Sequence, residues 1–160
     1  MKKLIIFICS FFIFILFSSC AIPNIYTINT KPSPNYYYTN LSSKISNTSF
    51  DVSIIDTNFY KNVNLTDEYK DMFKNFISYI NIQDITEDST KTFNKEAYRI
   101  HVKFSDGSKY LIKVIDKETI LLNPEDGRYS EDIISMKNIP VRYNLYDLCT
   151  NLLNMPLKIS

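Results

Sequence analysis

The chain carries few side chains that do chemistry, and their numbers narrow the reactions open to it. His101 is the only histidine among 160 residues, and Gly107 and Gly127 are the only glycines. A single imidazole excludes HExxH and every other site that needs two histidines from one chain. Two isolated glycines exclude a phosphate-binding P-loop, a dinucleotide-binding GxGxxG and a GxSxG nucleophile elbow. Nucleotide-dependent enzymes of those types are ruled out, and we expect neither a cofactor nor a metal.

Four acidic residues around one turn are the main candidates for catalysis: Glu125, Asp126, Glu131 and Asp132. Paired carboxylates carry out glycoside hydrolysis, and His101 has the side chain of a general base in a Ser-His-Asp arrangement. Carboxylates at turns are usually only solvated, however, and spacing alone establishes no triad. The sequence therefore favours a non-catalytic protein, with a small hydrolase that uses these carboxylates or His101 as the alternative.

An alternating pattern of apolar residues predicts a hairpin whose register can be argued. In residues 98–104 every second side chain is large and apolar, which is typical of a strand with one buried face. A two-residue Asp106-Gly107 turn would distribute the apolar side chains over both faces. A three-residue loop closed by Gly107 instead pairs Val102 with Tyr110 and keeps them on one face. The same argument extends to a third strand, so even-numbered positions are predicted to point inward across three strands.

The outward face of this hairpin is the candidate binding site, and its basic members are Arg99, His101, Lys103, Lys109 and Lys113. The register places Arg99 opposite Lys113, and Lys103 opposite Lys109. Like charges directly across a strand pair are destabilising, so this face is expected either to be fully solvated or to meet an anionic partner. Because apolar residues lie on the same face, it could instead pack beneath a helix or contact a partner protein.

Two amphipathic helices are predicted beside the strands. Residues 69–80 have an apolar stripe at helical spacing with Thr66 as N-cap, and a second helix follows Asn144 and ends before Pro156. Cys149 lies on the stripe of the second helix and is expected to be a buried, inert thiol. With a first strand at residues 50–54 and a short fourth strand at 128–130, we predict an α+β domain over residues 50–160. Its expected architecture is an antiparallel β-meander of three to four strands with one helix packed on one face and the C-terminal helix closing an end or the other face.

The first 20 residues indicate export. Lys2 and Lys3 precede an apolar run at residues 4–17, shorter than the roughly 20 residues that a membrane-spanning helix needs. The run ends in Ser18-Ser19-Cys20, which resembles the lipobox of bacterial lipoproteins. This resemblance implies a lipoprotein signal peptide at residues 1–19 and a Cys20 carrying two palmitate-type chains, which would anchor the protein to the extracytoplasmic face of the cell membrane. An ordinary secretory signal or an uncleaved anchor is the alternative.

Residues 20–49 are predicted to be the lipidated cysteine and a flexible tether, because they are rich in Asn, Ser, Thr and Pro and lack apolar periodicity. The run Tyr36-Tyr37-Tyr38 is interpreted as an interfacial or docking tract in that tether, with a binding element as the alternative. Charges nearly balance, with 18 Lys and Arg against 17 Asp and Glu, so no nucleic-acid partner is expected. If Cys9 is removed and Cys20 is lipidated, Cys149 has no partner for a disulfide.

Three segments resemble a small family of clostridial lipoproteins with no known function: residues 104–110 (FSDGSKY), 124–129 (PEDGRY) and 143–149 (YNLYDLC). The resemblance covers about residues 50–153, implies a Gram-positive origin and supplies no catalytic residue. We therefore expect a membrane-anchored lipoprotein whose domain binds an envelope protein or an anionic envelope polymer. A purely structural accessory subunit and a small envelope hydrolase are the alternatives.

Overall fold

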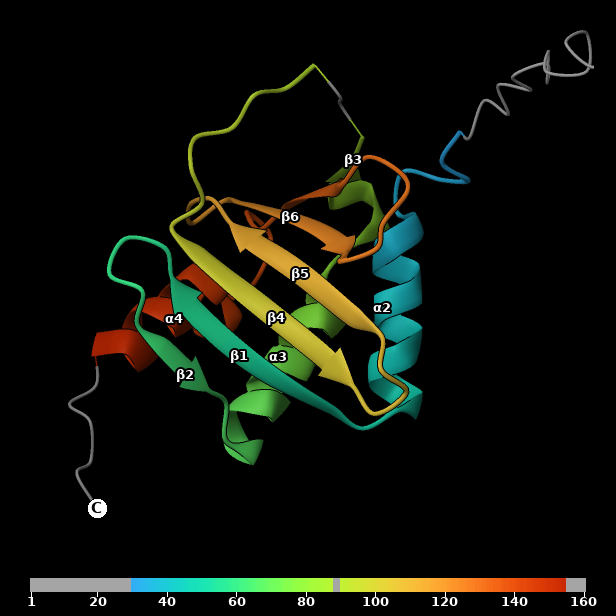
Figure 1. Ribbon diagram of the computed structural model, residues 1–160. Helices are drawn as coiled ribbons and strands as arrows, with labels where there is room; N and C mark the ends of the chain where they lie inside the picture. The colour runs from blue at the N-terminus through green and yellow to red at the C-terminus, as the bar shows by residue number, and fades with distance from the viewer. Residues whose placement is uncertain (1–29, 88–89, 155–160) are drawn as a thin grey trace, which may run out of the picture.

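The strands predicted from the alternating pattern form the centre of one antiparallel sheet. The computed structural model describes residues 30–87 and 90–154 (Figure 1), and its sheet has the strand order β2-β1-β4-β5-β6-β7-β3. The strands are β1 Phe50–Asp56, β2 Asn62–Asn64, β3 Ile85–Thr86, β4 Tyr98–Phe104, β5 Lys109–Val114, β6 Thr119–Pro124 and β7 Asp132–Ser135. The helices are α2 Tyr36–Asn47, α3 Asp67–Tyr79 and α4 Leu145–Asn154, with short 3-10 turns at Ile82–Asp84 and Val141–Tyr143.

The predicted register is confirmed. Val102 pairs with Tyr110 across β4 and β5, and Ile112 pairs with Leu122 across β5 and β6. Gly107 has a φ of 87°, the left-handed conformation that closes the three-residue loop. Even-numbered side chains of β4, β5 and β6 are buried, as the pattern requires, except Tyr98 and Pro124 at the strand ends, which are partly buried.

The α+β class is confirmed, but the sheet has seven strands where three to four were expected. The edge strands β2 and β3 have three and two residues, which is too short for a periodic pattern to show. The strand expected at residues 128–130 lies instead at β7, where Ile133 and Ile134 are both buried and no alternation marks it.

All three helices pack on the face of the sheet that carries the even-numbered side chains (Figure 1). From α3, Phe73 and Phe76 are fully buried, and the stripe of α4 joins the same core. Asn144 caps α4 by accepting a hydrogen bond from the Tyr146 amide at 3.0 Å. Of the two places predicted for the C-terminal helix, the end of the sheet matches the structure and the other face does not. On the same side as α3, α4 contacts Tyr98 at the start of β4, Lys117 in the β5–β6 turn and Lys61 in the β1–β2 turn.

The predicted tether needs correction at residues 36–47, which form α2. This helix buries Tyr37, Leu41 and Ile45 in the core. Apolar side chains four residues apart form a stripe only one residue wide, so surrounding Asn and Ser residues hid it from a composition argument. The folded unit therefore begins near Lys31 instead of at residue 50, and Lys31 itself is buried.

Several expectations lie outside the described residues. They are the signal peptide at 1–19, Cys20 with the first part of the tether, and the last residues of the domain, 155–160. Across residues 30–87 and 90–154, no helix combines the length and apolar character needed to cross a bilayer.

Candidate functional site

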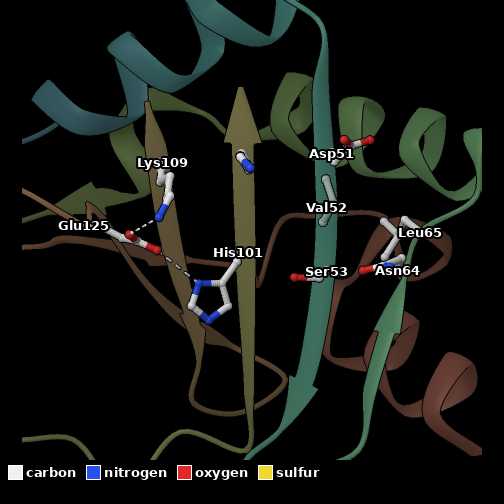
Figure 2. Close-up of a pocket in the computed structure, with 9 residues that line it drawn as sticks. Asp51, Val52, Ser53, Asn64, Leu65, His101, Lys109 and Glu125 are labelled. Atoms are coloured by element: carbon white, nitrogen blue, oxygen red, sulfur yellow. Dashed lines mark hydrogen bonds and ion pairs between the residues drawn. The ribbon is translucent and has the colours of Figure 1, made fainter. Parts of the chain in front are cut away.

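The candidate site is the face of the sheet that the three helices leave uncovered, here called the open face. It consists of the odd-numbered side chains of β1, β4, β5 and β6, of which Leu121 of β6 is buried. Over β1 and β4 this face is hollowed by a volume of about 510 Å³, with the polar side chains in Figure 2 around it. Those polar residues are Asp51, Ser53, Asn64, His101, Lys103, Lys109 and Glu125.

All five basic residues predicted for the site lie on the open face. Arg99 is opposite Lys113, and Lys103 is opposite Lys109, as the register requires. His101 is opposite Leu111 between the two pairs. His101, Lys103 and Lys109 line the hollow, whereas Arg99 and Lys113 lie one row further along the strands.

Carboxylates lie beside the two lysines that line the hollow, Lys103 and Lys109. Glu125 follows β6, and its two oxygens lie 3.4 Å from His101 Nδ1 and 3.3 Å from Lys109 Nζ (Figure 2). In the register, Lys103 is opposite Asp51 of β1. The hollow is therefore lined by both signs of charge.

The outer basic row is compensated in the same way. Glu131 lies 2.7 Å from Lys113, and Glu96 forms an ion pair with Arg99. Four carboxylates thus stand beside the basic residues of the open face. The like-charge pairs that suggested a polyanion site are locally neutralised.

Three carboxylates of the open face, Glu125, Glu96 and Asp51, have lowered pKa values. Partial desolvation would raise the pKa of Glu125, but the hydrogen bonds from Lys109 and His101 outweigh it and lower that pKa. Glu96 behaves alike, because its contact with Arg99 outweighs desolvation and lowers its pKa. A hydrogen bond from Lys70 lowers the pKa of Asp51. These three carboxylates therefore carry their negative charge at any pH near neutrality.

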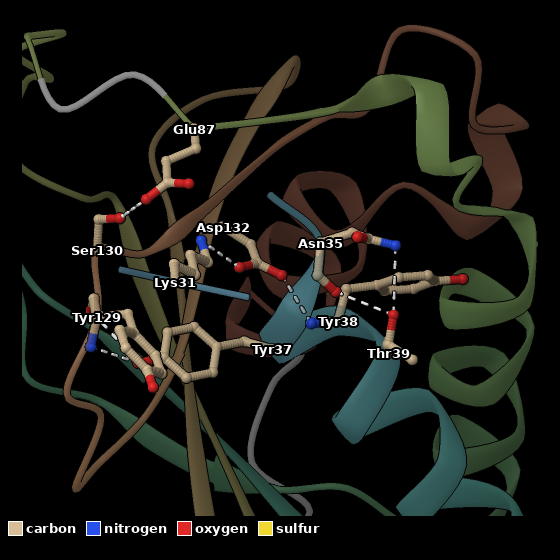
Figure 3. A network of polar contacts seen from close by, with 9 residues as sticks. All are labelled: Lys31, Asn35, Tyr37, Tyr38, Thr39, Glu87, Tyr129, Ser130 and Asp132. Atoms are coloured by element: carbon tan, nitrogen blue, oxygen red, sulfur yellow. Dashed lines mark hydrogen bonds and ion pairs between the residues drawn. The ribbon is translucent and has the colours of Figure 1, made fainter. Parts of the chain in front are cut away.

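The four carboxylates singled out for hydrolysis do not converge. Glu125 and Glu131 form the ion pairs of the open face, whereas Asp126 lines a different groove beside α2. Asp132 is fully buried on the helix side, 2.7 Å from Lys31 Nζ (Figure 3). Burial raises the pKa of Asp132, and Lys31 opposes that effect. Their separation gives no paired carboxylates for glycoside hydrolysis.

One arrangement does match the order of groups in an acyl hydrolase. Ser53 of β1 is directly opposite His101 of β4, and His101 contacts Glu125 on its other side (Figure 2). Among the described residues, no hydrogen bond joins Ser53 to His101. Backbone amides at this place are engaged in the strand ladder, so they do not form an oxyanion hole. Ser53, His101 and Glu125 therefore lie in the order of a catalytic triad, but the hydrogen bond between the serine and the histidine is missing.

Sequence reasoning named Glu125 and Glu131 only as candidates for hydrolysis and missed their ion pairs with the basic residues. It also missed Glu96 and the polar residues of β1 and β2. Asp51 and Ser53 continue the alternation of β1 and were visible as polar positions, but the pairing of β1 with β4 was not. Glu96, Glu125 and Glu131 come from turns, where side-chain direction does not follow strand periodicity. Cys149 is buried as predicted, and burial raises the pKa of its thiol.

Comparison with known proteins supports the sequence resemblance. Residues 31–149 match the family described as "Domain of unknown function (DUF4883)". The solved structure described as "Crystal Structure of Putative Lipoprotein from Clostridium perfringens" is 26% identical, with a TM-score of 0.71. The match covers 79% of this chain and 100% of that one. No curated protein matches the chain. The resemblance to clostridial lipoproteins predicted from the three segments is confirmed.

Proposed function

We propose, from the fact that this chain belongs to the DUF4883 family, that it is a lipoprotein held at the extracytoplasmic face of the cell membrane through Cys20. Its folded domain would bind another envelope protein through the open face. The solved relative described as a lipoprotein supports the class. Two acyl chains on Cys20 would give the stable attachment that one chain does not.

The observation that carries the binding role is the uncovered face itself. Three helices pack on one face of the sheet, whereas the other presents a hollow of about 510 Å³ lined by charged and amide side chains. Both signs of charge alternate there, with Glu125 between His101 and Lys109. Alternating charge fixes the register of a complementary protein surface. A polyanion would be repelled by the four carboxylates, so we favour a protein over an anionic polymer.

An exposed aromatic turn at one end of β1 also favours a protein partner. Phe59 and Tyr60 are 78% and 81% exposed, and Tyr60 has a φ of 55°, which is uncommon outside glycine. The turn is ordered: Asp56 Oδ1 accepts hydrogen bonds from the amides of Asn58 and Phe59 at 2.8 and 3.0 Å. Ordered, exposed aromatic rings serve as anchors in protein interfaces.

A site-specific crosslinking experiment tests the binding role. A photo-reactive residue at Asn64, in the hollow, should capture one envelope protein in stoichiometric amounts from intact cells. The same residue at Asn75, exposed on α3, is the matched control and should capture none. Lys103→Glu should weaken capture at Asn64 several-fold, whereas Lys74→Glu on α3 should not. Equal capture at both positions would contradict the proposal.

Further measurements on the same cells distinguish the alternative functions. An anionic polymer partner would appear as wall binding that falls steeply with salt, and loss of that binding in Lys103→Glu would replace the protein proposal. An envelope hydrolase would appear as ester hydrolysis abolished by both Ser53→Ala and His101→Ala. We expect no such activity. Mass spectrometry of the mature N-terminus tests the anchor, and an unmodified Cys20 would refute it.

A further inference from the structure

A second cavity, here called the tyrosine groove, lies between α2 and the turn at residues 124–129. Its volume is about 420 Å³, within the range of about 300–1,000 Å³ typical of small-molecule sites. The rings of Tyr36, Tyr110 and Tyr129 and the polar side chains of Asn40, Asp126 and Arg128 are among its walls. The groove shares Lys109 with the open face, but its tyrosines and its other polar side chains are not part of that face.

The groove is built from rigid walls. Tyr37 Oη accepts a hydrogen bond from the Tyr129 amide at 2.7 Å, which ties the turn to α2 (Figure 3). Asp132 accepts one from the Tyr38 amide at 2.7 Å and forms the buried ion pair with Lys31. Both side chains of that pair are at most 2% exposed, so α2 is fixed to β7 at the position of the groove.

Gly127 allows the turn to approach this closely. A Cβ atom there would lie 3.0 Å from Tyr37 Oη and 3.1 Å from the Pro124 carbonyl oxygen. The first contact would require Tyr37 or the turn to move by a few tenths of an ångström, and the second would distort the turn itself. The groove thus has a defined width before any ligand arrives, which lowers the entropic cost of binding.

The aromatic rings form a corner. The rings of Tyr36 and Tyr129 are perpendicular, with centroids 5.6 Å apart, and Tyr36 lies 5.5 Å from Tyr37. Tyrosines offer an apolar face and a hydroxyl group with little conformational entropy to lose. Such a corner suits a ligand that has both C–H faces and hydroxyl groups.

The polar walls narrow the ligand class further. Asn40, Asp126 and Arg128 supply an amide, a carboxylate and a guanidinium, and no hydrogen bond or ion pair engages these side chains among the described residues. Lys44 and Lys109 also line the groove, but they form ion pairs with Asp106 and Glu125. A polyanion would face Asp126, and a polycation would face Arg128. Hydroxyl groups both donate and accept, so they satisfy all three side chains at once.

We propose that the tyrosine groove binds a neutral saccharide unit of a cell-envelope glycan. Tyr36 supplies the ring on which the sugar lies, and Asn40 and Arg128 hydrogen-bond its hydroxyl groups. Tyr36, Asn40 and Arg128 do not line the hollow of the open face, so each role can fail without the other.

Co-sedimentation with cell-wall sacculi stripped of their phosphate polymers tests the proposal, using the purified full chain in detergent. Binding should persist at high salt and should be competed by soluble N-acetylglucosamine tetramer. Tyr36→Ala should weaken it at least tenfold and Arg128→Ala about fivefold, whereas Tyr36→Phe should stay within threefold because the ring remains. Tyr79→Ala, which removes another partly exposed tyrosine, is the control and should bind like the wild type.

Two results would overturn the proposal. One is the absence of binding to stripped sacculi and to the tetramer. The other is equal binding by Tyr36→Ala and the wild type. Binding that requires the phosphate polymers and fades with salt would assign the groove to a polyanion and also refute a neutral saccharide. Thermal unfolding of each variant separates loss of the site from loss of the fold, and the Asn64 crosslink should be unchanged in Tyr36→Ala.

Discussion

The two faces of the sheet are made by alternate residues of the same strands, yet they are held in different ways. Ile112 is fully buried beneath the helices, whereas its neighbours Leu111 and Lys113 lie half-buried on the open face. The helix side is stabilised by close packing of apolar side chains. Ion pairs neutralise the charges of the open face, and each exposed pair contributes only about 0–1 kcal/mol to the free energy of unfolding. The pleat therefore separates residues that stabilise the fold from residues available for binding.

The largest expected effect tests that separation within one strand. Ile112→Ala should lower the free energy of unfolding by about 4 kcal/mol, because it leaves a cavity in the core. Leu111→Ala, one residue earlier, should cost less than about 1 kcal/mol, because its side chain already meets solvent. Urea unfolding of the two variants measures the difference. Similar losses would show that the open face is covered and packed like the other side.

A second prediction concerns the exception on the helix side, where the buried pair Lys31 and Asp132 lies among apolar residues. Lys31→Met should cost about 3 kcal/mol at pH 7, because it leaves a buried carboxylate without its cation. Lys44→Met is the matched control. Its partner Asp106 is about half exposed, so the loss should stay below about 1 kcal/mol.

The stability of Lys31→Met should depend on pH, and the direction of that dependence follows from the pKa of Asp132. The pKa of Asp132 is already raised by burial, and losing Lys31 should raise it further. A carboxyl whose pKa is higher in the folded state binds more protons there, so stability rises as the pH falls through that pKa. The penalty of Lys31→Met should therefore shrink in urea unfolding at pH 5. A penalty that grows in acid would contradict the assigned ion pair.

The smallest effect is expected on the open face. Glu125→Gln should change the free energy of unfolding by less than about 0.5 kcal/mol at pH 7, because the carboxylate is exposed and screened. Its pKa is lowered from 4.5, so its small contribution is present above that pH and is lost below it. Wild-type stability should thus fall slightly more steeply in acid than that of the variant. A loss above about 1.5 kcal/mol would make Glu125 part of the structural core.

Sequence reasoning worked where one periodic pattern determined the structure. The alternation through β4, β5 and β6 and the closing role of Gly107 defined the register, because every other pairing mixes apolar and polar faces. The stripe of α3 and the Asn144 cap of α4 were equally local signals. From that register followed the positions of all five basic residues.

The remaining features depend on contacts that no local pattern records. The helix α2 has a stripe one residue wide, and its burial comes from β7 and the turn at residues 124–129, some 90 residues later. The ion pairs of the open face are made by turn residues such as Glu125 and Glu131. The Tyr36-Tyr37-Tyr38 run was visible, but the opposite wall of its groove was not.

The attachment of Lys31 to Asp132 determines how far the domain stands from the bilayer, if Cys20 is its lipid anchor. Lys31 follows Cys20 by 11 residues, so the distance between them cannot exceed about 40 Å on any path. A domain starting at residue 50 would be allowed about 100 Å. With that anchor, the N-terminal end of the folded domain would stay within about 40 Å of the lipid headgroups, and its ligands would be met near the membrane.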